Sequence, residues 1–294
     1  MAEIKVTLPD ESTRTLPEGS TGADLAADVG RSLAKAAIAL TVNGETKDLS
    51  NSLSDGDAVS VITSDTEDGL YVLRHSTAHV LAQAVLSIWE GATYAIGPPS
   101  KDGFYYDFEL PGGATFTEDD LTNIEKRMRE IIKEDQHFER HEVPSEEALE
   151  LFVNHKFKKE IIERVSTGEM DSEISNEASA EGIISYYKNG QDFVDLCTGP
   201  HVPSTGKLGH FALQKVAGAY WRGDEKQPML QRIYGTAWAS KKDLEDYLER
   251  LAEAEKRDHR RLATELDLVS WPEDLGPGLA VWHPKGSLIR KVIE

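Results

Sequence analysis

The sequence predicts an α+β protein of two or three domains, and three observations support this. The chain has 294 residues, more than one typical domain. Hydrophobic residues make up 39% of the chain and include five Trp and eight Phe, which is enough to fill real cores. Strand-like segments, glycine-rich turns and amphipathic helical segments then follow one another along the chain in an order that suits α+β domains.

Residues 1–63 predict a small α+β domain. "IKVTLPDESTRTL" gives two short strands around a turn at Pro9-Asp10, and "STGADLAADVG" gives a helix with Thr21 as N-cap and Gly30 as stop. "AIALTVNGETKDL" places a hairpin turn at Asn43-Gly44, and "DAVSVIT" supplies a closing strand. A hairpin, a helix and further strands in this order are typical of a ubiquitin-like β-grasp.

Residues from about 70 to 239 predict a larger α+β domain that follows a polar linker, "SDTEDG", at 64–69. It opens with a helix that carries "RHSTAHVLAQAV". Two more helices are expected, an amphipathic one at 117–135 that Thr117 caps and another that starts in 145–153. The remaining segments are strand-like and rich in turns.

From Ser240 to about Leu266 the pattern predicts one long charged helix with a narrow apolar seam, the kind that bridges domains. Its "KRDHRR", 256–261, is either a basic patch for a polyanion or a salt-bridged solvent face. A Pro/Gly-rich stretch and one last helix follow, so that either a third domain begins here or the chain was cut.

Composition narrows the classes of partner. The net charge of −20 argues mildly against nucleic acid, because phosphate contacts need local Lys and Arg, but a basic patch on an acidic protein can still bind RNA. The single cysteine, Cys197, excludes an intramolecular disulfide and suits a reducing cytosol. No run of eighteen apolar residues and no signal peptide is present, so we expect a soluble cytoplasmic protein with no membrane partner.

Two short motifs carry candidate chemistry. His75 and His79 lie four residues apart on the first helix of the second domain and can point at the same spot. Ser76 stands where a zincin motif has Glu, so that motif is excluded. Cys197 and His201 form a second pair, and together the four side chains suit either a zinc site or metal-free proton transfer. Spacing alone does not choose between these.

Other residues suit a polar substrate. Asp195 precedes the cysteine and can orient a neighbouring group, whereas Lys158 and Lys159 are by default solvated surface residues. In "GAYWRGD", Arg222 stands beside aromatic residues, which suits phosphate contact or base stacking, and a tight turn with a structural aromatic is an equal alternative. A cysteine nucleophile is a minor alternative, since no hydrolase signature surrounds Cys197.

Together the motifs resemble a known family. "LRHSTAH", "AIGP" with "GFYYD", "VDLCTGPHVP", "AGAYWRGD", "LQRIYGTAW" and "KRDHRRLATELDL" are similar, in this order, to blocks of bacterial threonyl-tRNA synthetase. The resemblance implies a TGS domain at 1–63, an editing domain at 64–240, a linker helix at 241–268 and the start of a class II catalytic domain at 269–294.

The resemblance also implies roles for single residues. It places His75, His79, Cys197 and His201 in a pocket that hydrolyses seryl-tRNA(Thr), with Asp195 as the acidic neighbour and Lys158 as the pocket lysine. Editing in this family is understood to need no obligatory metal, whereas related alanyl-type domains use the equivalent four residues for zinc. The positions expected to contact the substrate or the tRNA are Tyr105, Tyr220 and Arg222.

For the parent enzyme the resemblance implies ATP, Mg and zinc in a catalytic domain downstream of Glu294, threonine and tRNA(Thr) as substrates, a homodimer and no DNA partner. If the 294 residues are the whole protein, we expect editing without synthesis. The alternatives are a TGS-containing RNA-binding or regulatory module without catalysis and a zinc hydrolase unrelated to tRNA.

Overall fold

The computed structural model describes residues 2–167, 182–276 and 278–294, and it divides into two compact units, Met1–Lys241 and Lys242–Glu294. Its ladders between named strands are antiparallel, which confirms the α+β class. Among the described residues, no helix has both the length and the apolar character that crossing a membrane would require.

The first elements of the chain form the small domain that the sequence predicts. Thr21 closes a capping box on the first helix, and Gly30 ends it. Asn43 and Gly44 both have positive φ, 52° and 90°, as the tight hairpin turn requires. A second short helix was not predicted. The elements are β1 (Glu3–Thr7), β2 (Thr13–Pro17), α1 (Gly22–Val29), α2 (Arg31–Ala36), β3 (Ala37–Val42), β4 (Glu45–Asp48) and β5 (Val59–Thr63).

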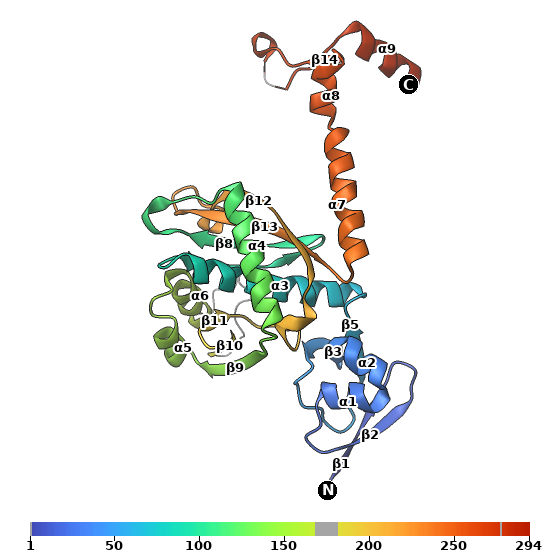
Figure 1. Ribbon diagram of the computed structural model, residues 1–294, viewed down its shortest axis with the longest axis vertical. Helices are drawn as coiled ribbons and strands as arrows, with labels where there is room; N and C mark the ends of the chain where they lie inside the picture. The colour runs from blue at the N-terminus through green and yellow to red at the C-terminus, as the bar shows by residue number, and fades with distance from the viewer. Residues whose placement is uncertain (1, 168–181, 277) are drawn as a thin grey trace. The chain divides into compact units, whose positions relative to one another are not determined.

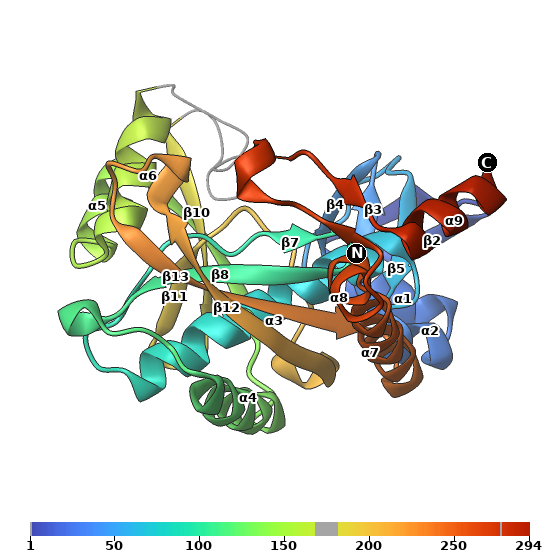
Figure 2. The same cartoon turned by 90° about the horizontal axis from the view of Figure 1, so that it is seen from above.

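The second domain contains two antiparallel sheets, one of strand order β12-β13-β8-β6 with β7 beside β8, and one of order β11-β10-β9. Helices α3 and α4 pack on the larger sheet, and α5 packs on the smaller one (Figures 1 and 2). The elements are α3 (Glu67–Ile88), β6 (Thr93–Tyr94), β7 (Pro99–Ser100), β8 (Gly103–Glu109), α4 (Glu118–Lys133), β9 (Phe138–Pro144), α5 (Ser145–Leu151), α6 (Lys156–Ser166), β10 (Ile183–Asn189), β11 (Phe193–Leu196), β12 (His210–Tyr220) and β13 (Met229–Trp238).

The prediction of a single helix from Ser240 to Leu266 is wrong. Helix α7 (Lys241–Lys256) ends, and α8 (His259–Glu265) begins after Asp258, whose carboxylate accepts a hydrogen bond from the Arg260 N–H at 2.7 Å. A side chain that caps a new first turn competes with continuation of the helix. Strands β14 (Val269–Ser270) and β15 (Val281–Trp282) and helix α9 (Pro284–Ile293) complete this unit.

The basic stretch 256–261 therefore straddles a helix break. Arg257 pairs with Glu253 at 2.9 Å, and Arg261 pairs with Glu265 at 3.3 Å. These contacts are the salt-bridged face that the sequence left as one alternative, and the pairs are exposed, so they add little to stability.

The predicted linker at 64–69 is also wrong. Thr66 caps α3 by accepting a hydrogen bond from the Gly69 N–H at 3.0 Å, so the helix begins only four residues after β5 ends. Ile38 and Ile62 of the first domain belong to the same hydrophobic cluster as Val72 of α3. The two domains therefore share a core and are not joined by a flexible segment.

Gly69 lies where α3 packs closely against the end of β5, and we expect a larger residue there to be destabilising. A Cβ at this position would lie 1.9 Å from the main-chain oxygen of Thr63, so Gly69→Ala forces the backbone to move. We expect a loss of about 2 kcal/mol in the free energy of unfolding, measured by urea denaturation. Gly209→Ala is the control, since no heavy atom lies within 4 Å of its Cβ, and it should stay within about 1 kcal/mol of the unsubstituted chain. Equal effects from both changes would contradict the close junction.

Candidate functional site

The two histidines of α3 lie inside the domain. The helix is buried on most sides from Val72 to Val85, and His75 and His79 are only 3% and 2% exposed. Polar groups this deep need partners, because an unpaired buried nitrogen costs free energy.

The partners come from the segment that follows β11. The Cys197 N–H donates to Ser185 O at 3.2 Å, and Ser185 Oγ donates to Cys197 O at 2.8 Å, which ties the cysteine to β10. Gly199 has a φ of 78°, and a Cβ there would lie 2.0 Å from the Tyr187 hydroxyl, so only glycine fits the turn. The turn brings His201 back toward the sulfur.

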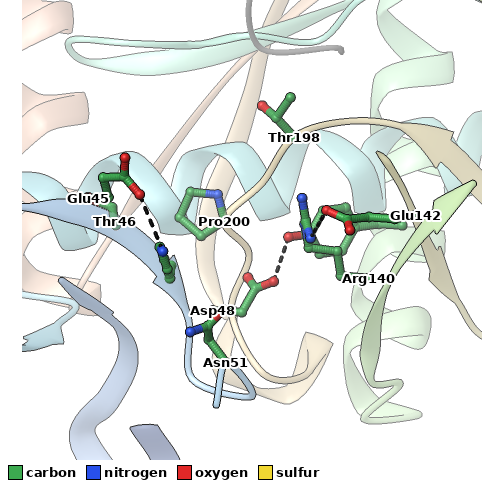
Figure 3. Close-up of a pocket in the computed structure, with 10 residues that line it drawn as sticks. Glu45, Thr46, Asp48, Asn51, Arg140, Glu142, Thr198 and Pro200 are labelled. Atoms are coloured by element: carbon green, nitrogen blue, oxygen red, sulfur yellow. Dashed lines mark hydrogen bonds and ion pairs between the residues drawn. The ribbon is translucent and has the colours of Figure 1, made fainter. Parts of the chain in front are cut away.

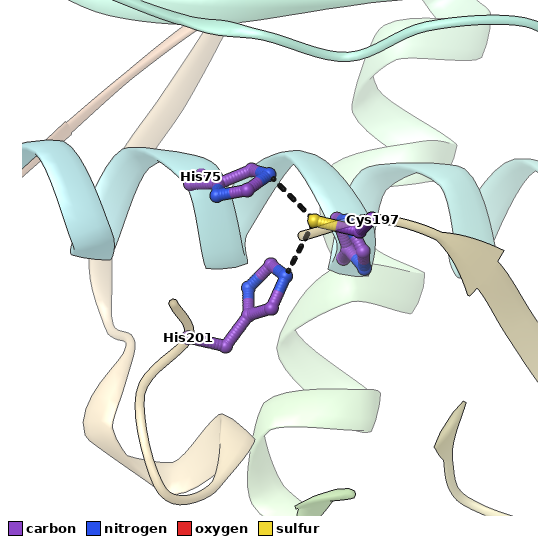
Figure 4. Close-up of side chains that lie close together, drawn as sticks. His75, Cys197 and His201 are labelled. Carbon is purple, nitrogen blue, oxygen red and sulfur yellow. Dashed lines mark hydrogen bonds between the residues drawn. The ribbon is translucent and has the colours of Figure 1, made fainter. Parts of the chain in front are cut away.

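The four side chains predicted from the two motifs converge. The ligand atoms of His75, His79, Cys197 and His201, here called the tetrad, all lie within 4.8 Å of one another. Cys197 Sγ is 3.2 Å from His75 Nε2 and 3.3 Å from His201 Nε2, and these two rings approach the sulfur from different sides (Figure 4). The Gly199 N–H also points at the sulfur, at 3.2 Å.

Ser76 sets the tautomer of His201. Its hydroxyl donates to Val72 O at 2.8 Å, accepts from the Val202 N–H at 3.0 Å and lies 3.1 Å from His201 Nδ1. The single hydroxyl proton is used on Val72, so Nδ1 of His201 donates and its Nε2 keeps a lone pair toward the sulfur. The residue that excluded the zincin motif thus orients one imidazole.

A buried carboxylate joins the tetrad to the rest of the site. Asp195 lies 2.8 Å from Lys158 Nζ and 3.4 Å from His79 Nε2, and it accepts a hydrogen bond from the Tyr106 hydroxyl at 2.6 Å. Lys158 is 0% exposed, so its default assignment to the solvated surface is wrong, and it lies beside Asp195, as the resemblance implies for a pocket lysine. Its ammonium lies over the rings of Tyr94 and Tyr106. A carboxylate beside Nε2 of His79 favours a proton there and leaves a lone pair on Nδ1.

Burial keeps the three imidazoles neutral. Burial, with the neighbouring His79 as a second cause, lowers the pKa of His75 from 6.5 to about 3. Burial and the charge of Lys158 lower the pKa of His79 well below 6.5, and burial with the two other histidines does the same to the pKa of His201. At neutral pH the tetrad therefore offers unprotonated nitrogens, which can accept a proton or bind a metal.

Two separations between ligand atoms are close to those of a zinc site, and all four ligand atoms lie within 4.8 Å of one another. Regular tetrahedral coordination with Zn–N and Zn–S bonds of ordinary length puts ligand atoms about 3.4–3.6 Å apart, close to the 3.2 and 3.3 Å measured from Cys197 Sγ. Nδ1 of His79 has no hydrogen-bond partner among the described residues, so it is open to a ligand or a water. Ser76 at Nδ1 of His201 is the outer hydrogen bond that a metal-bound imidazole usually makes.

The residues predicted to contact substrate lie elsewhere. Tyr105 alternates with Tyr106 along β8 and so faces the opposite side of the sheet, where the Arg232 guanidinium stacks 3.8 Å from its ring centre. Tyr220 ends β12 and is exposed, and Arg222 lies in the following turn, 3.3 Å from Glu160. At this turn the contacts favour the interpretation of a structural aromatic, because the Trp221 indole N–H donates to Glu160 at 3.0 Å.

Two contacts of the site were not predicted. Tyr106 donates to Asp195, and the sequence "GFYYD" signals only that one tyrosine of the pair faces inward, not which one. Asp48, from the first domain, accepts a hydrogen bond from the His201 N–H at 2.7 Å, across 153 residues of sequence, and no local pattern indicates this.

Comparison with known proteins agrees with these features. Residues 4–63 match the TGS domain, and residues 184–234, which include Asp195, Cys197 and His201, match the threonyl and alanyl tRNA synthetase second additional domain. Threonine–tRNA ligase from Acidithiobacillus ferrooxidans is 53% identical over 291 residues, covering 98% of this chain and 43% of the relative.

Further relatives show the same pattern. The threonine–tRNA ligase of Citrifermentans bemidjiense is 48% identical over 100% of this chain and 44% of its own length, and that of Rubrobacter xylanophilus is 48% identical over 98% and 43%. The chain thus spans less than half the length of the curated relatives it matches.

The neutral imidazoles predict acid lability. Because their pKa values are lowered in the folded state, the stability they contribute is complete above pH 6.5, the ordinary pKa, and is lost as the pH falls below it. In chelator-treated protein we expect the free energy of unfolding to fall by up to about 1.4 kcal/mol per pH unit for each histidine. Urea denaturation at pH 7, 6 and 5 measures this.

Two variants locate the acid effect. In His79→Gln the free energy of unfolding should fall less steeply as the pH is lowered. In His259→Gln, at an exposed position on α8, the dependence of that free energy on pH should be unchanged. A stability that stays constant between pH 7 and 5 would contradict neutral, buried imidazoles.

Proposed function

The chain belongs to the bacterial threonyl-tRNA synthetase family, and we propose that its second domain, residues 64–240, hydrolyses mischarged seryl-tRNA(Thr). The observation that carries the proposal is the convergence of the tetrad with Lys158 and Asp195 in one buried site. In the same proposal, residues 1–63 are the TGS domain, 241–268 link the domains and 269–294 begin a class II catalytic domain.

Such a site is needed because serine and threonine are too alike for one binding pocket to separate. Serine is threonine without one methyl group, and a missing methyl changes binding by only about 1–3 kcal/mol. A single binding pocket therefore separates the two amino acids by roughly 10- to 200-fold, which is too little for translation. A second site that tests the finished ester supplies the remaining discrimination.

The proposed reaction is hydrolysis of an ester. Water attacks the carbonyl carbon of the seryl ester, the bond from that carbon to the ribose oxygen breaks, and the ribose oxygen receives a proton. His75 is neutral and can accept the proton that water gives up, and Lys158 assists as a nearby cation held in place by Asp195. Free serine and tRNA(Thr) with an intact 3′ end are the products.

The other members of the site bind and discriminate. We propose that the amino acid and the ribose of the terminal adenosine meet beside His79, Cys197 and His201, whose side chains cluster in the structure. The rings stand close, with centroids of His79 and His201 4.1 Å apart, so an added methyl on the substrate has little room. In this proposal the threonyl ester is excluded by size.

The proposed hydrolysis needs no metal, although the tetrad could hold one. If zinc were held by His75, His79, Cys197 and His201, it would supply a Lewis acid, but a water could reach it only as a fifth ligand or in place of one of these side chains. Lys158 would stay paired with Asp195, which also lies 3.4 Å from His79 Nε2.

The proposal extends to partners. The relatives are named threonine–tRNA ligases, and we infer tRNA(Thr) as the nucleic-acid partner and a cytoplasmic location. Charging of tRNA(Thr) with threonine and ATP, with Mg and zinc as cofactors and a homodimer as the active form, is proposed for a chain that also carries the catalytic domain. Tyr105, Tyr220 and Arg222 are proposed contacts of substrate or tRNA.

The central prediction concerns selectivity. The protein should hydrolyse seryl-tRNA(Thr) and leave threonyl-tRNA(Thr) intact, measured as release of radiolabelled amino acid from the two esters. Release of neither amino acid would favour a TGS-containing RNA-binding module. Equal release of both would contradict the proposal that the site excludes the methyl group of threonine.

Two neighbouring lysines give a matched pair of variants. Lys158→Met should lower the rate about 100-fold, whereas Lys159→Met, with a side chain 46% exposed and 3.8 Å from Glu163, should stay within about twofold. Removing Lys158 from its buried ion pair also lowers the free energy of unfolding by about 3–5 kcal/mol, so Lys158→Met could lose activity by unfolding. His75→Gln leaves the ion pair in place and is therefore assayed as a second variant. An active, folded His75→Gln variant would remove His75 from the mechanism.

Treatment with a chelator distinguishes a metal-free site from one that binds zinc. We expect the rate of seryl-tRNA(Thr) hydrolysis to survive thorough treatment with a chelator, with metal analysis showing less than one zinc per chain. Activity that is lost on chelation and returns with zinc would overturn the metal-free mechanism and keep the tetrad as ligands.

A further inference from the structure

The first domain contributes one side chain to the surroundings of the tetrad. Asp48, the last residue of β4, accepts the His201 N–H at Oδ1, 2.7 Å away, and the Tyr187 hydroxyl at Oδ2, 2.5 Å away. Figure 3 shows Asp48 beside Pro200, in the cleft between the two domains. Both hydrogen bonds join the first domain to the walls of the candidate site.

The main chain around His201 has few other anchors. At the start of the loop, Cys197 is tied to Ser185 by two hydrogen bonds, and after it the Val202 N–H donates to Ser76. The His201 N–H lies between these points and is held by Asp48 alone among the hydrogen bonds of the described residues. The bond therefore fixes the place from which the imidazole leaves the main chain.

The His201 ring depends on this placement. Tyr187 meets its edge at a centroid distance of 4.4 Å, Phe138 stacks on its face at 4.9 Å, and Ser76 lies at its Nδ1. With these contacts kept, Nε2 comes within 3.3 Å of Cys197 Sγ. A shift of the main chain moves all of these contacts together.

The carboxylate is held rigidly from its own side. β4 pairs with β3, and β3 shares a hydrophobic cluster with α3, the helix that carries His75 and His79. Lys207 Nζ adds a third hydrogen bond between the domains by donating to Lys35 O at 2.7 Å. The first domain is thus a fixed frame for Asp48 and not a mobile attachment.

The position has an electrostatic cost. Burial raises the pKa of Asp48 above its usual 3.8, although the bonds from Tyr187 and His201 oppose the shift. A neutral apolar side chain would dock the two domains without that cost. A buried carboxylate at this position is explained if both of its oxygens are needed as acceptors, one for the His201 N–H and one for the Tyr187 hydroxyl.

We propose that Asp48 is a positioning residue of the candidate active site, through which the first domain sets the place of the His201 imidazole. Its effect on rate rests on the proposed editing function, but its effect on the geometry of the tetrad does not. Asp48 acts through the main chain of His201 and has no contact with substrate in this proposal.

Three substitutions separate the two bonds of Asp48. Asp48→Ala removes both, Asp48→Asn keeps an acceptor for the His201 N–H, and Tyr187→Phe removes only the hydroxyl bond. Asp57→Ala is the matched control, because this carboxylate of the same domain also accepts two bonds, from Ser54 and Asn43, away from the tetrad. All are made in the full chain and compared with it in thermal stability.

For seryl-tRNA(Thr) hydrolysis, Asp48→Ala should lower kcat by about 10- to 100-fold with KM unchanged, since a displacement near 1 Å is enough for such a loss. Asp48→Asn, Tyr187→Phe and Asp57→Ala should stay within about threefold. If Asp48→Ala does not fold, Asp48→Glu replaces it, and its extra methylene should lower kcat at least fivefold. An Asp48→Ala variant with unchanged kcat, or a loss matched by Asp57→Ala, would overturn the proposal.

A second readout needs no tRNA. Cys197 is the single cysteine of the chain, so alkylation by iodoacetamide at fixed pH reports on one site. Asp48→Ala should change the alkylation rate at least fivefold, and Asp48→Asn and Asp57→Ala should not. A chain that never hydrolyses seryl-tRNA(Thr) would sink the proposed function alone, whereas equal alkylation rates in all variants would sink the role of Asp48.

Discussion

The buried ion pair between Asp195 and Lys158 is the interaction on which the rest of the site depends. Asp195 stands on β11, two residues before the cysteine, and it gathers Lys158 from α6, Tyr106 from β8 and His79 from α3. Four elements that are far apart in sequence are thereby fixed around one carboxylate. Two opposite charges this deep are tolerable only because each has the other and further polar or aromatic neighbours.

Unlike the charged pair Asp195–Lys158, the three imidazoles of the tetrad carry no charge at neutral pH. Its imidazoles are neutral because burial and their mutual proximity disfavour protonation. Neutral nitrogens beside a fixed ammonium suit a reaction in which water loses a proton and negative charge develops on an ester oxygen. The same nitrogens suit zinc, so one arrangement of side chains is compatible with both forms of chemistry.

The sequence predicted the fold class, most elements of the first domain and the tetrad, because these depend on local patterns. A capping residue such as Thr21, a turn such as Asn43-Gly44 and an i, i+4 pair are visible within a few residues. Contacts across the fold were not visible in local patterns, and only the family resemblance indicated a pocket position for Lys158. Lys158 and Lys159 are neighbours in a similar local sequence, and only the packing of α6 decides that the first is buried and the second exposed. Asp48 likewise lies in an ordinary hairpin strand, and its partner is 153 residues away.

The place where the substrate binds tests the proposed editing site most directly. The structure of the protein with serine joined by an amide bond to 3′-amino-3′-deoxyadenosine, a stable mimic of the charged tRNA end, would show it. We expect the seryl group to contact His75, Cys197 and His201, with the carbonyl carbon open to a water beside His75. A seryl group bound at another place, such as the turn that carries Arg222, would contradict an editing site at the tetrad.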